Sequence, residues 1–201
     1  MSDETRRTIA SYDEIATAYA DFWSDRRVVE RPLTMFASLL PHQALVLDAG
    51  CGPGFDSTLL RERGLRVVGL DRSVAMLQLG RARYPGPYVQ GDLLGLPFAP
   101  WVLHGIWASA TLLHLPRHDF APVLTEFMRV LAPGGLLYLS LKEGEGEEWR
   151  TDACGHEAPR FFTYWQPEAL DAALSGAGFA MIASWRESGR TATWLNRIVH
   201  I

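Results

Sequence analysis

Residues 45–54 read LVLDAGCGPG, an apolar run that ends in an acid and passes into a turn of small residues. The turn holds Gly50, Gly52 and Gly54, and an amphipathic stretch follows it at 56–63. Glycines at such a turn let a ligand approach the backbone closely, because side chains would otherwise fill that space. A buried strand, a glycine-rich turn and a helix in this order are typical of the nucleotide-binding edge of an α/β sheet.

The rest of the chain alternates between apolar segments and amphipathic ones. Strands are expected at 44–48, 65–71, 88–91, 105–110 and 136–141, with helices at 56–63, 73–84, 117–131 and 167–176. Residues 179–186 and 192–200 read as two closing strands joined by Ser188-Gly189-Arg190. This alternation predicts an α/β fold with a mainly parallel sheet and helices on both faces.

Two segments do not follow the alternation. Residues 1–40 are predicted to be helical, with Tyr12, Ile15 and Tyr19 recurring on one face. Residues 142–165 follow the fifth strand and are first polar and glycine-bearing, then aromatic. A long segment at that position lies beside the crevice at the carboxyl ends of the strands, so it is predicted to be a functional loop or lid.

Composition limits the class of protein further. A chain of 201 residues that is 48% hydrophobic is predicted to form a single domain over 1–201. Its net charge of -4 gives no general attraction to nucleic acid, and no apolar run approaches the roughly 18 residues of a membrane span. The charged start differs from a signal peptide, so a cytoplasmic location is expected, with a monomer as the default. Cys51 and Cys154 lie too far apart for a multi-cysteine metal cluster, and no metal site is predicted.

Acids around the glycine turn disfavour a phosphate ligand. The dinucleotide fingerprint G-x-G-x-x-G would place its third glycine at Phe55, and a P-loop would need a lysine where Asp56 follows. Asp48 adds a second negative charge beside the turn. These features argue against a pyrophosphate and favour a ligand with a positive charge.

Two further acids complete a nucleoside site. Asp71 ends the second strand about 20 residues beyond the glycine turn, where it is placed to accept the hydroxyls of a ribose. Asp92 follows the third strand beside the apolar Leu93 and is placed to bind an adenine amino group. Ribose, adenine and a positive charge near Asp48 together indicate S-adenosylmethionine.

The chain resembles the class I (Rossmann-like) S-adenosylmethionine-dependent methyltransferases of the small-molecule type. The resemblance rests on 47–54 (LDAGCGPG), Asp71 before a helix cap, Gly91-Asp92 with Leu96-Pro97-Phe98, and 131–135 (LAPGG), in the family's order. It implies a seven-stranded sheet in the order 3-2-1-4-5-7-6 with strand 7 antiparallel. It also implies that 1–40 forms a helical cap over the cofactor. One departure is the start of the fourth strand, WVLHG at 101–105, where the family commonly has Phe-Asp.

The resemblance also implies a set of cofactor contacts. These are Tyr12, Tyr19, Asp48, Gly50, Cys51, Gly52, Asp71, Arg72, Met76, Asp92, Leu93 and Ser109. The implied reaction is direct displacement at the sulfonium methyl by an acceptor, expected to be a small molecule, with alignment as the main task of the protein. Two alternatives stay open, namely a non-catalytic S-adenosylmethionine-binding sensor or partner subunit and, less favoured, an NAD-dependent oxidoreductase.

The acceptor side carries weaker signals. His114 follows the fourth strand at the mouth of the crevice and is a candidate general base or a packing residue. Candidates for the acceptor pocket are His114, Trp149, His156, Arg160 and Tyr164. The acidic stretch 142–150 has the alternative reading of a solvated loop, and the aromatic residues at 161–165 that of core packing.

Overall fold

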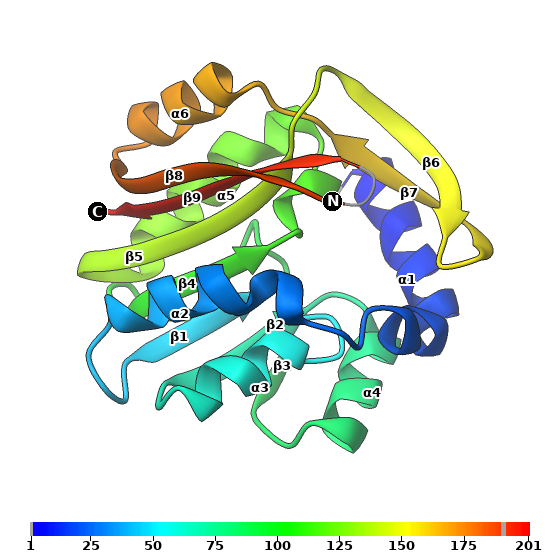
Figure 1. The fold of residues 1–201 in the computed structure, drawn as a ribbon, viewed down its shortest axis with the longest axis horizontal. Helices are drawn as coiled ribbons and strands as arrows, with labels where there is room; N and C mark the ends of the chain where they lie inside the picture. The colour runs from blue at the N-terminus through cyan, green and yellow to red at the C-terminus, as the bar shows by residue number, and fades with distance from the viewer. Residues whose placement is uncertain (1, 190–191) are drawn as a thin grey trace.

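A computed structural model describes residues 2–189 and 192–201, and it contains one seven-stranded sheet and one separate two-stranded sheet (Figure 1). The strands of the main sheet are β1 (Leu45–Ala49), β2 (Arg66–Asp71), β3 (Tyr88–Gln90), β4 (Leu103–Ser109), β5 (Leu131–Lys142), β8 (Ala180–Ser188) and β9 (Thr193–His200). The small sheet pairs β6 (Glu147–Ala153) with β7 (His156–Thr163). The helices are α1 (Asp3–Phe22), η1 (Arg27–Val29), α2 (Glu30–Ser38), α3 (Phe55–Glu62), α4 (Val74–Arg83), η2 (Leu112–His114), α5 (Arg117–Val130) and α6 (Pro167–Gly176).

The strand order of the main sheet is β3-β2-β1-β4-β5-β9-β8. β1 to β5 pair in parallel, whereas β9 runs antiparallel to both β5 and β8. Since β8 and β9 are the sixth and seventh strands of this sheet, the expected order and the antiparallel last strand are confirmed. The predicted turn between them includes Arg190, which lies outside the described residues. The carboxyl ends of the parallel strands meet at one edge, where ligands bind in open α/β sheets.

Helices cover both faces of the main sheet because the strands alternate their side chains between two cores. Leu47 of β1 belongs to a cluster with residues of α5 and α6, whereas its neighbour Val46 packs with residues of α2 and α3. In Figure 1, α2 lies in front of the sheet and α5 behind it. Within the described ranges, no helix is both long and apolar enough to cross a bilayer.

The segment 142–165 is mainly a β-hairpin rather than an irregular loop. β5 continues to Lys142, and β6 and β7 then pair with each other outside the main sheet. Figure 1 shows this hairpin in yellow beside α1. Ser11 of α1 donates to the carbonyl oxygen of Pro159 at 2.6 Å, and the backbone N–H of Phe161 donates to Thr8 at 3.0 Å. The hairpin is thus fixed to α1.

Residues 1–40, predicted to be helical, divide between two places in the fold. α1 lies across the carboxyl edge of the sheet, between α4 and the hairpin. α2 instead covers the sheet, because its fully buried Leu33 and Phe36 pack with Val46 and Trp107. Only the α1 part of this segment therefore reaches the ligand-binding edge.

Candidate active site

A cavity lies at the carboxyl edge of the sheet, between the glycine turn, the ends of β2 and β4, and α1. The predicted residues that line it are Tyr12, Tyr19, Gly50, Gly52, Asp71, Arg72, Met76, Asp92, Leu93, Ser109 and His114. Residues that line it without having been predicted are Thr5, Thr8, Ile9, Leu70, Gly91, Ala110, Thr111 and Leu115. These unpredicted residues lie on α1 or at and after the ends of β2, β3 and β4, beside residues that were predicted.

The glycines of the turn serve two different purposes. A Cβ at Gly50 would lie 1.9 Å from Oγ1 of Thr111, so this glycine is required by packing. A Cβ at Gly52 would meet no atom within 4 Å, although its φ of +52° is unfavourable for other residues. Gly52 therefore faces open cavity space. Such a space, lined by bare backbone, fits a ligand that contacts the turn directly.

Asp71 connects this turn to the start of α4. Its carboxylate accepts hydrogen bonds from the backbone N–H of Gly52 at 2.8 Å and from that of Ser73 at 2.9 Å. Ser73 in turn caps α4 by accepting from the N–H of Met76 at 3.1 Å. Burial raises the pKa of Asp71. The acid at the end of β2 thus holds the glycine turn while it lines the cavity.

Asp92 and Arg72 form the rim on the side of β3. One carboxylate oxygen of Asp92 pairs with the Arg72 guanidinium, and the other accepts from the N–H of Leu94 at 3.1 Å. Leu93 is buried beside them. An acid next to an apolar side chain offers a hydrogen-bond acceptor and a flat contact, as an adenine ring requires.

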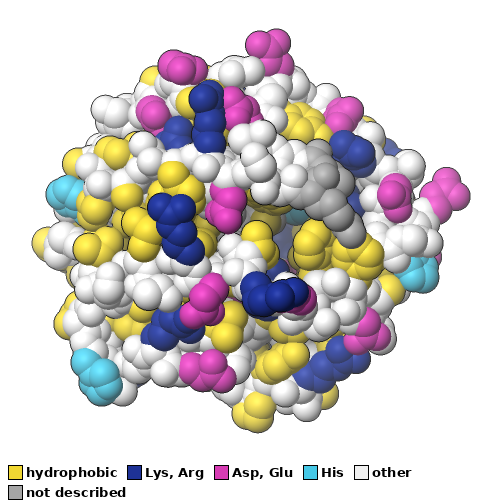
Figure 2. Space-filling view, in the orientation of Figure 1, with side chains coloured by type: hydrophobic (Ala, Val, Ile, Leu, Met, Phe, Trp, Pro, Cys, Tyr) yellow, Lys and Arg dark blue, Asp and Glu magenta, His cyan; other side chains and the backbone are white. Residues whose placement is uncertain are grey.

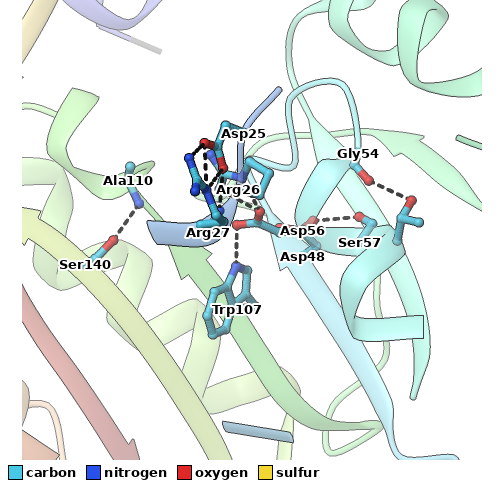
Figure 3. Close-up of polar contacts among 11 residues, drawn as sticks. Asp25, Arg26, Arg27, Asp48, Gly54, Asp56, Ser57, Trp107, Ala110 and Ser140 are labelled. Atoms are coloured by element: carbon cyan, nitrogen blue, oxygen red, sulfur yellow. Dashed lines mark hydrogen bonds and ion pairs between the residues drawn. The ribbon is translucent and has the colours of Figure 1, made fainter. Parts of the chain in front are cut away.

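Asp48 and Cys51 do not line the cavity. Strand alternation directs Asp48 to the α3 side of the sheet, where it accepts a hydrogen bond from Ser57 at 2.6 Å (Figure 3). Cys51 packs in a small cluster with Leu77 and Tyr88. The structure therefore does not bring these two predicted side chains to the cavity.

Asp48 should make stability depend on pH. Burial, and next the charge of Asp56, raises the pKa of Asp48 from its usual value near 4 to about 7. The raised pKa means that the native state favours the protonated acid. The stabilisation by protonated Asp48 is complete below the pKa that this acid has in the unfolded chain. It is lost as the pH rises through about 7. Asp48→Asn, which cannot ionise, should therefore gain stability relative to the parent as the pH rises.

Urea unfolding of the cofactor-free protein between about pH 4 and pH 8 measures this difference. A difference between parent and Asp48→Asn that stayed constant across the range would contradict the assignment. Because Asn can still accept the hydrogen bond from Ser57, the comparison isolates the charge.

Asp56 organises a buried ionic network below the turn (Figure 3). It pairs with Arg26, with contacts of 2.8 Å to Nε and 2.6 Å to Nη2, and accepts from Nε1 of Trp107 at 2.9 Å. Arg26 follows the end of α1, and Trp107 lies in β4. The network therefore ties the segment after α1 to the sheet.

Asp13 fixes α1 to α4 on the cavity side. Its carboxylate accepts from the Ser73 hydroxyl at 2.6 Å and from the N–H of Ala75 at 3.0 Å. An acid at a helix N-terminus is favourable because it meets unpaired N–H groups and the positive end of the helix dipole. Asp13 lies in the segment 1–40 that was predicted to be helical, but its partner in α4 could not be identified from spacing.

His114 and Tyr12 close the cavity on the side of the hairpin. Nδ1 of His114 lies 2.7 Å from the carbonyl oxygen of Phe161, and Nε2 lies 2.8 Å from the Tyr12 hydroxyl. A carbonyl only accepts, so Nδ1 carries the proton, and Nε2 accepts from Tyr12. Desolvation lowers the pKa of His114 to about 3, with smaller contributions from the charges of Arg160 and Lys142. The imidazole is therefore neutral at physiological pH.

The other acceptor candidates lie on the hairpin or next to it, outside the lining of the cavity. Trp149 packs against Phe161, and its ring carries Arg7 at 4.2 Å. Tyr164 donates to Glu148 at 2.7 Å, and His156 is exposed near the hairpin turn. Arg160 is the nearest of them, with its guanidinium 5.7 Å from the ring centre of Tyr12.

Comparison with known proteins identifies the class. A family model described as a methyltransferase domain matches residues 47–139. Together with the sheet order and the lined cavity, this match identifies residues 47–139 as a methyltransferase domain of the class I (Rossmann-like), S-adenosylmethionine-dependent kind. S-adenosylmethionine is the cofactor of that family.

The chain is also similar to named methyltransferases, over part of their length. The chain is 34% identical over 139 residues to malonyl-[acyl-carrier protein] O-methyltransferase of Enterobacter lignolyticus, covering 66% of this chain and 53% of the relative. It is 34% identical over 178 residues to trans-aconitate 2-methyltransferase of Methylobacterium nodulans, covering 86% and 64%. The chain thus spans about half the length of most curated relatives that it matches.

Solved structures share the fold at low identity. Burkholderia thailandensis 1,6-didemethyltoxoflavin-N1-methyltransferase, solved with S-adenosylhomocysteine, has a TM-score of 0.76 at 21% identity, covering 100% of this chain and 90% of that one. The [4+2]-cyclase SpnF has a TM-score of 0.79 at 17% identity, covering 99% and 97%. Since a cyclase shares the architecture, the reaction has to be argued from the site.

Proposed function

We propose that this chain transfers the methyl group of S-adenosylmethionine to a small-molecule acceptor. The observation that carries the proposal is the open space at Gly52, which lies between Asp71 and the α1 residues of one cavity. The curated relatives are named for transfer to malonyl-carrier protein and to trans-aconitate, which supports the reaction class. In the view of Figure 2, Lys and Arg side chains are interspersed with Asp and Glu rather than gathered into one basic surface.

The residues present fit this cofactor. Asp71 would hold the ribose, Asp92 and Leu93 would contact the adenine, and the backbone at Gly50 and Gly52 would lie under the methionine portion. When bound, the cofactor supplies a methyl group on a positively charged sulfur, which needs little further activation. Alignment and exclusion of water are then the contributions required of the protein. α1 serves as the cap over the cofactor within a single domain, and the hairpin 147–163 faces the acceptor.

His114 is better suited to positioning than to accepting a proton. Both of its ring nitrogens already have partners, and its pKa of about 3 makes its protonated form a strong acid at neutral pH. Tyr12 keeps its proton because burial raises its pKa. The pair therefore forms a fixed wall. An acceptor whose nucleophile is already deprotonated needs no base at this wall.

Thermal stabilisation by S-adenosylmethionine, S-adenosylhomocysteine and NAD at equal concentrations tests the cofactor. We expect S-adenosylhomocysteine at 100 times its Kd to raise the free energy of unfolding by about 2.7 kcal/mol, and NAD to have no effect. Stabilisation by NAD alone would overturn the proposal. Formation of S-adenosylhomocysteine over an acceptor panel then tests turnover, and binding without turnover on any acceptor would support a sensor instead.

A further inference from the structure

Lys142 is the single lysine of the chain, and the other 18 of its 19 Lys and Arg residues are arginines. It is the last residue of β5, at the carboxyl edge of the parallel strands, and its side chain is partly buried. Its Nζ lies 4.1 Å from the ring centre of Phe162 and 5.8 Å from that of Trp194. The ammonium group of the single lysine side chain therefore lies against aromatic rings at the ligand-binding edge of the sheet.

Arg160 of β7 lies over the same aromatic ring. Its guanidinium is 5.4 Å from the ring centre of Phe162 and 5.7 Å from that of Tyr12. Nη2 donates to the carbonyl oxygen of Asp152 at 2.7 Å, whereas Nε is buried without a hydrogen-bond partner in the part of the chain that the structure describes. A buried donor without an acceptor is costly, and native proteins retain few of them.

Neither cation is neutralised by a carboxylate. Among the described side chains, no acid lies within 4.0 Å of the charged nitrogens of Lys142 or Arg160. The acid whose charge acts on Lys142 is Glu148, and it is already engaged by the Tyr164 hydroxyl at 2.7 Å and by Arg150 at 3.8 Å. Burial, and then the charges of Arg150 and Arg160, lowers the pKa of Lys142 to about 8. Two cations without a carboxylate partner among the described side chains thus lie against the ring of Phe162, and their charges act on each other.

This place adjoins the cavity. The ring of Phe162 lies 4.7 Å from that of His114, which lines the cavity and bonds to Tyr12. Lys142 and Arg160 are both near enough to disfavour a positive charge on His114. An anion bound here would therefore sit beside the wall formed by His114 and Tyr12.

We propose that Lys142 and Arg160 form an anion subsite that binds a carboxylate of the methyl acceptor. The inference rests on the proposed methyltransferase function and adds the substrate class, a small organic acid. An ammonium group and the free Nε–H of Arg160 provide donors for the two oxygens of a carboxylate. Relief of the repulsion between the two cations adds to the binding free energy.

Because the chain has one lysine, acetylation by an amine-reactive ester reports on Lys142 directly, with the terminal amine as internal reference. The full chain, saturated with S-adenosylhomocysteine, is acetylated near the pKa of Lys142, at about pH 8, with malonate, neutral malonamide or inorganic phosphate at matched ionic strength. We expect malonate to slow acetylation of Lys142 saturably and to leave the terminal amine unchanged. Malonamide should give no protection.

Variants separate the subsite from general charge. Arg160→Gln should weaken the malonate protection at least about tenfold, since a charge-assisted hydrogen bond is lost. Arg150→Gln removes a cation of the same hairpin that already has Glu148 as partner, and it should weaken protection less than about threefold. Equal protection in Arg160→Gln and the parent, or none by malonate, would overturn the proposal. Stronger protection by phosphate would overturn the carboxylate assignment.

Thermal stabilisation by S-adenosylhomocysteine on the same samples distinguishes the two proposals. Stabilisation of the parent and of both variants, with no protection by malonate, would refute the subsite alone. Malonate protection without any stabilisation by S-adenosylhomocysteine would instead refute the proposed function.

Discussion

Gly52→Val should abolish binding of S-adenosylhomocysteine, with a loss of affinity of at least about 100-fold. The valine side chain would enter the space that the cofactor is expected to fill, because nothing else lies within 4 Å of a Cβ at this position. The φ of +52° adds a strain of about 1–2 kcal/mol to the valine variant, which lowers its free energy of unfolding and does not itself change the affinity for the ligand. Calorimetric titration of the variant measures the affinity, and urea unfolding measures the stability.

Gly134→Val is the matched control for this change. Gly134 also has a positive φ, of +76°, and also has nothing within 4 Å of a built Cβ. It lies near the amino end of β5, at the edge of the sheet opposite the cavity. We expect a similar loss of stability and unchanged affinity. Normal binding by Gly52→Val, or equal loss in both variants, would show that the glycine turn does not contact the cofactor.

Asp56→Ala should lower the free energy of unfolding by about 3–5 kcal/mol. The side chain of Asp56 is 8% exposed and that of Arg26 19% exposed, so the variant leaves a largely buried guanidinium without a counter-charge. It also leaves Nε1 of Trp107 without its acceptor. Chemical denaturation with Trp fluorescence measures the change.

Asp25→Ala provides the control one residue from Arg26. Asp25 also pairs with an arginine, Arg27, but both side chains are largely exposed, so water replaces the lost contact and stability should change little. The double variant Arg26→Met with Asp56→Leu should recover much of the loss, because it removes the uncompensated charge. An Asp56→Ala protein as stable as the parent would mean that the network contributes nothing.

The half of the site formed by strand ends could be predicted from sequence because its signals are local. Asp71 ends a strand, Gly52 and Asp92 lie shortly after strands, and parallel strands bring their carboxyl ends together. The sheet order followed from the family resemblance, and the alternation of apolar and amphipathic segments supported it. These predictions needed no knowledge of how distant segments pack.

The remainder depends on long-range packing, which spacing does not encode. Asp48 was expected at the cofactor, but strand alternation directs its carboxylate beneath α3. The hairpin was missed because β6, EEWRTDA, is polar and mostly exposed, so it lacks the apolar pattern of a buried strand. Thr5, Thr8 and Ile9 line the cavity only because of how α1 is held. Asp13 binds α1 to the start of α4, and Thr8 binds it to the hairpin.

The hairpin has a consequence for how such a protein can diversify. Its ladder of backbone hydrogen bonds is internal to β6 and β7, and no strand of the main sheet takes part in it. Insertions or substitutions there leave the register of the seven-stranded sheet untouched, and with it the cofactor half of the cavity. The contacts that have to be maintained are those to α1 at Thr8 and Ser11, and the hydrogen bonds from the hairpin to His114 and Leu115. New acceptor preferences can therefore evolve on 147–163 without loss of the ability to bind the methyl donor.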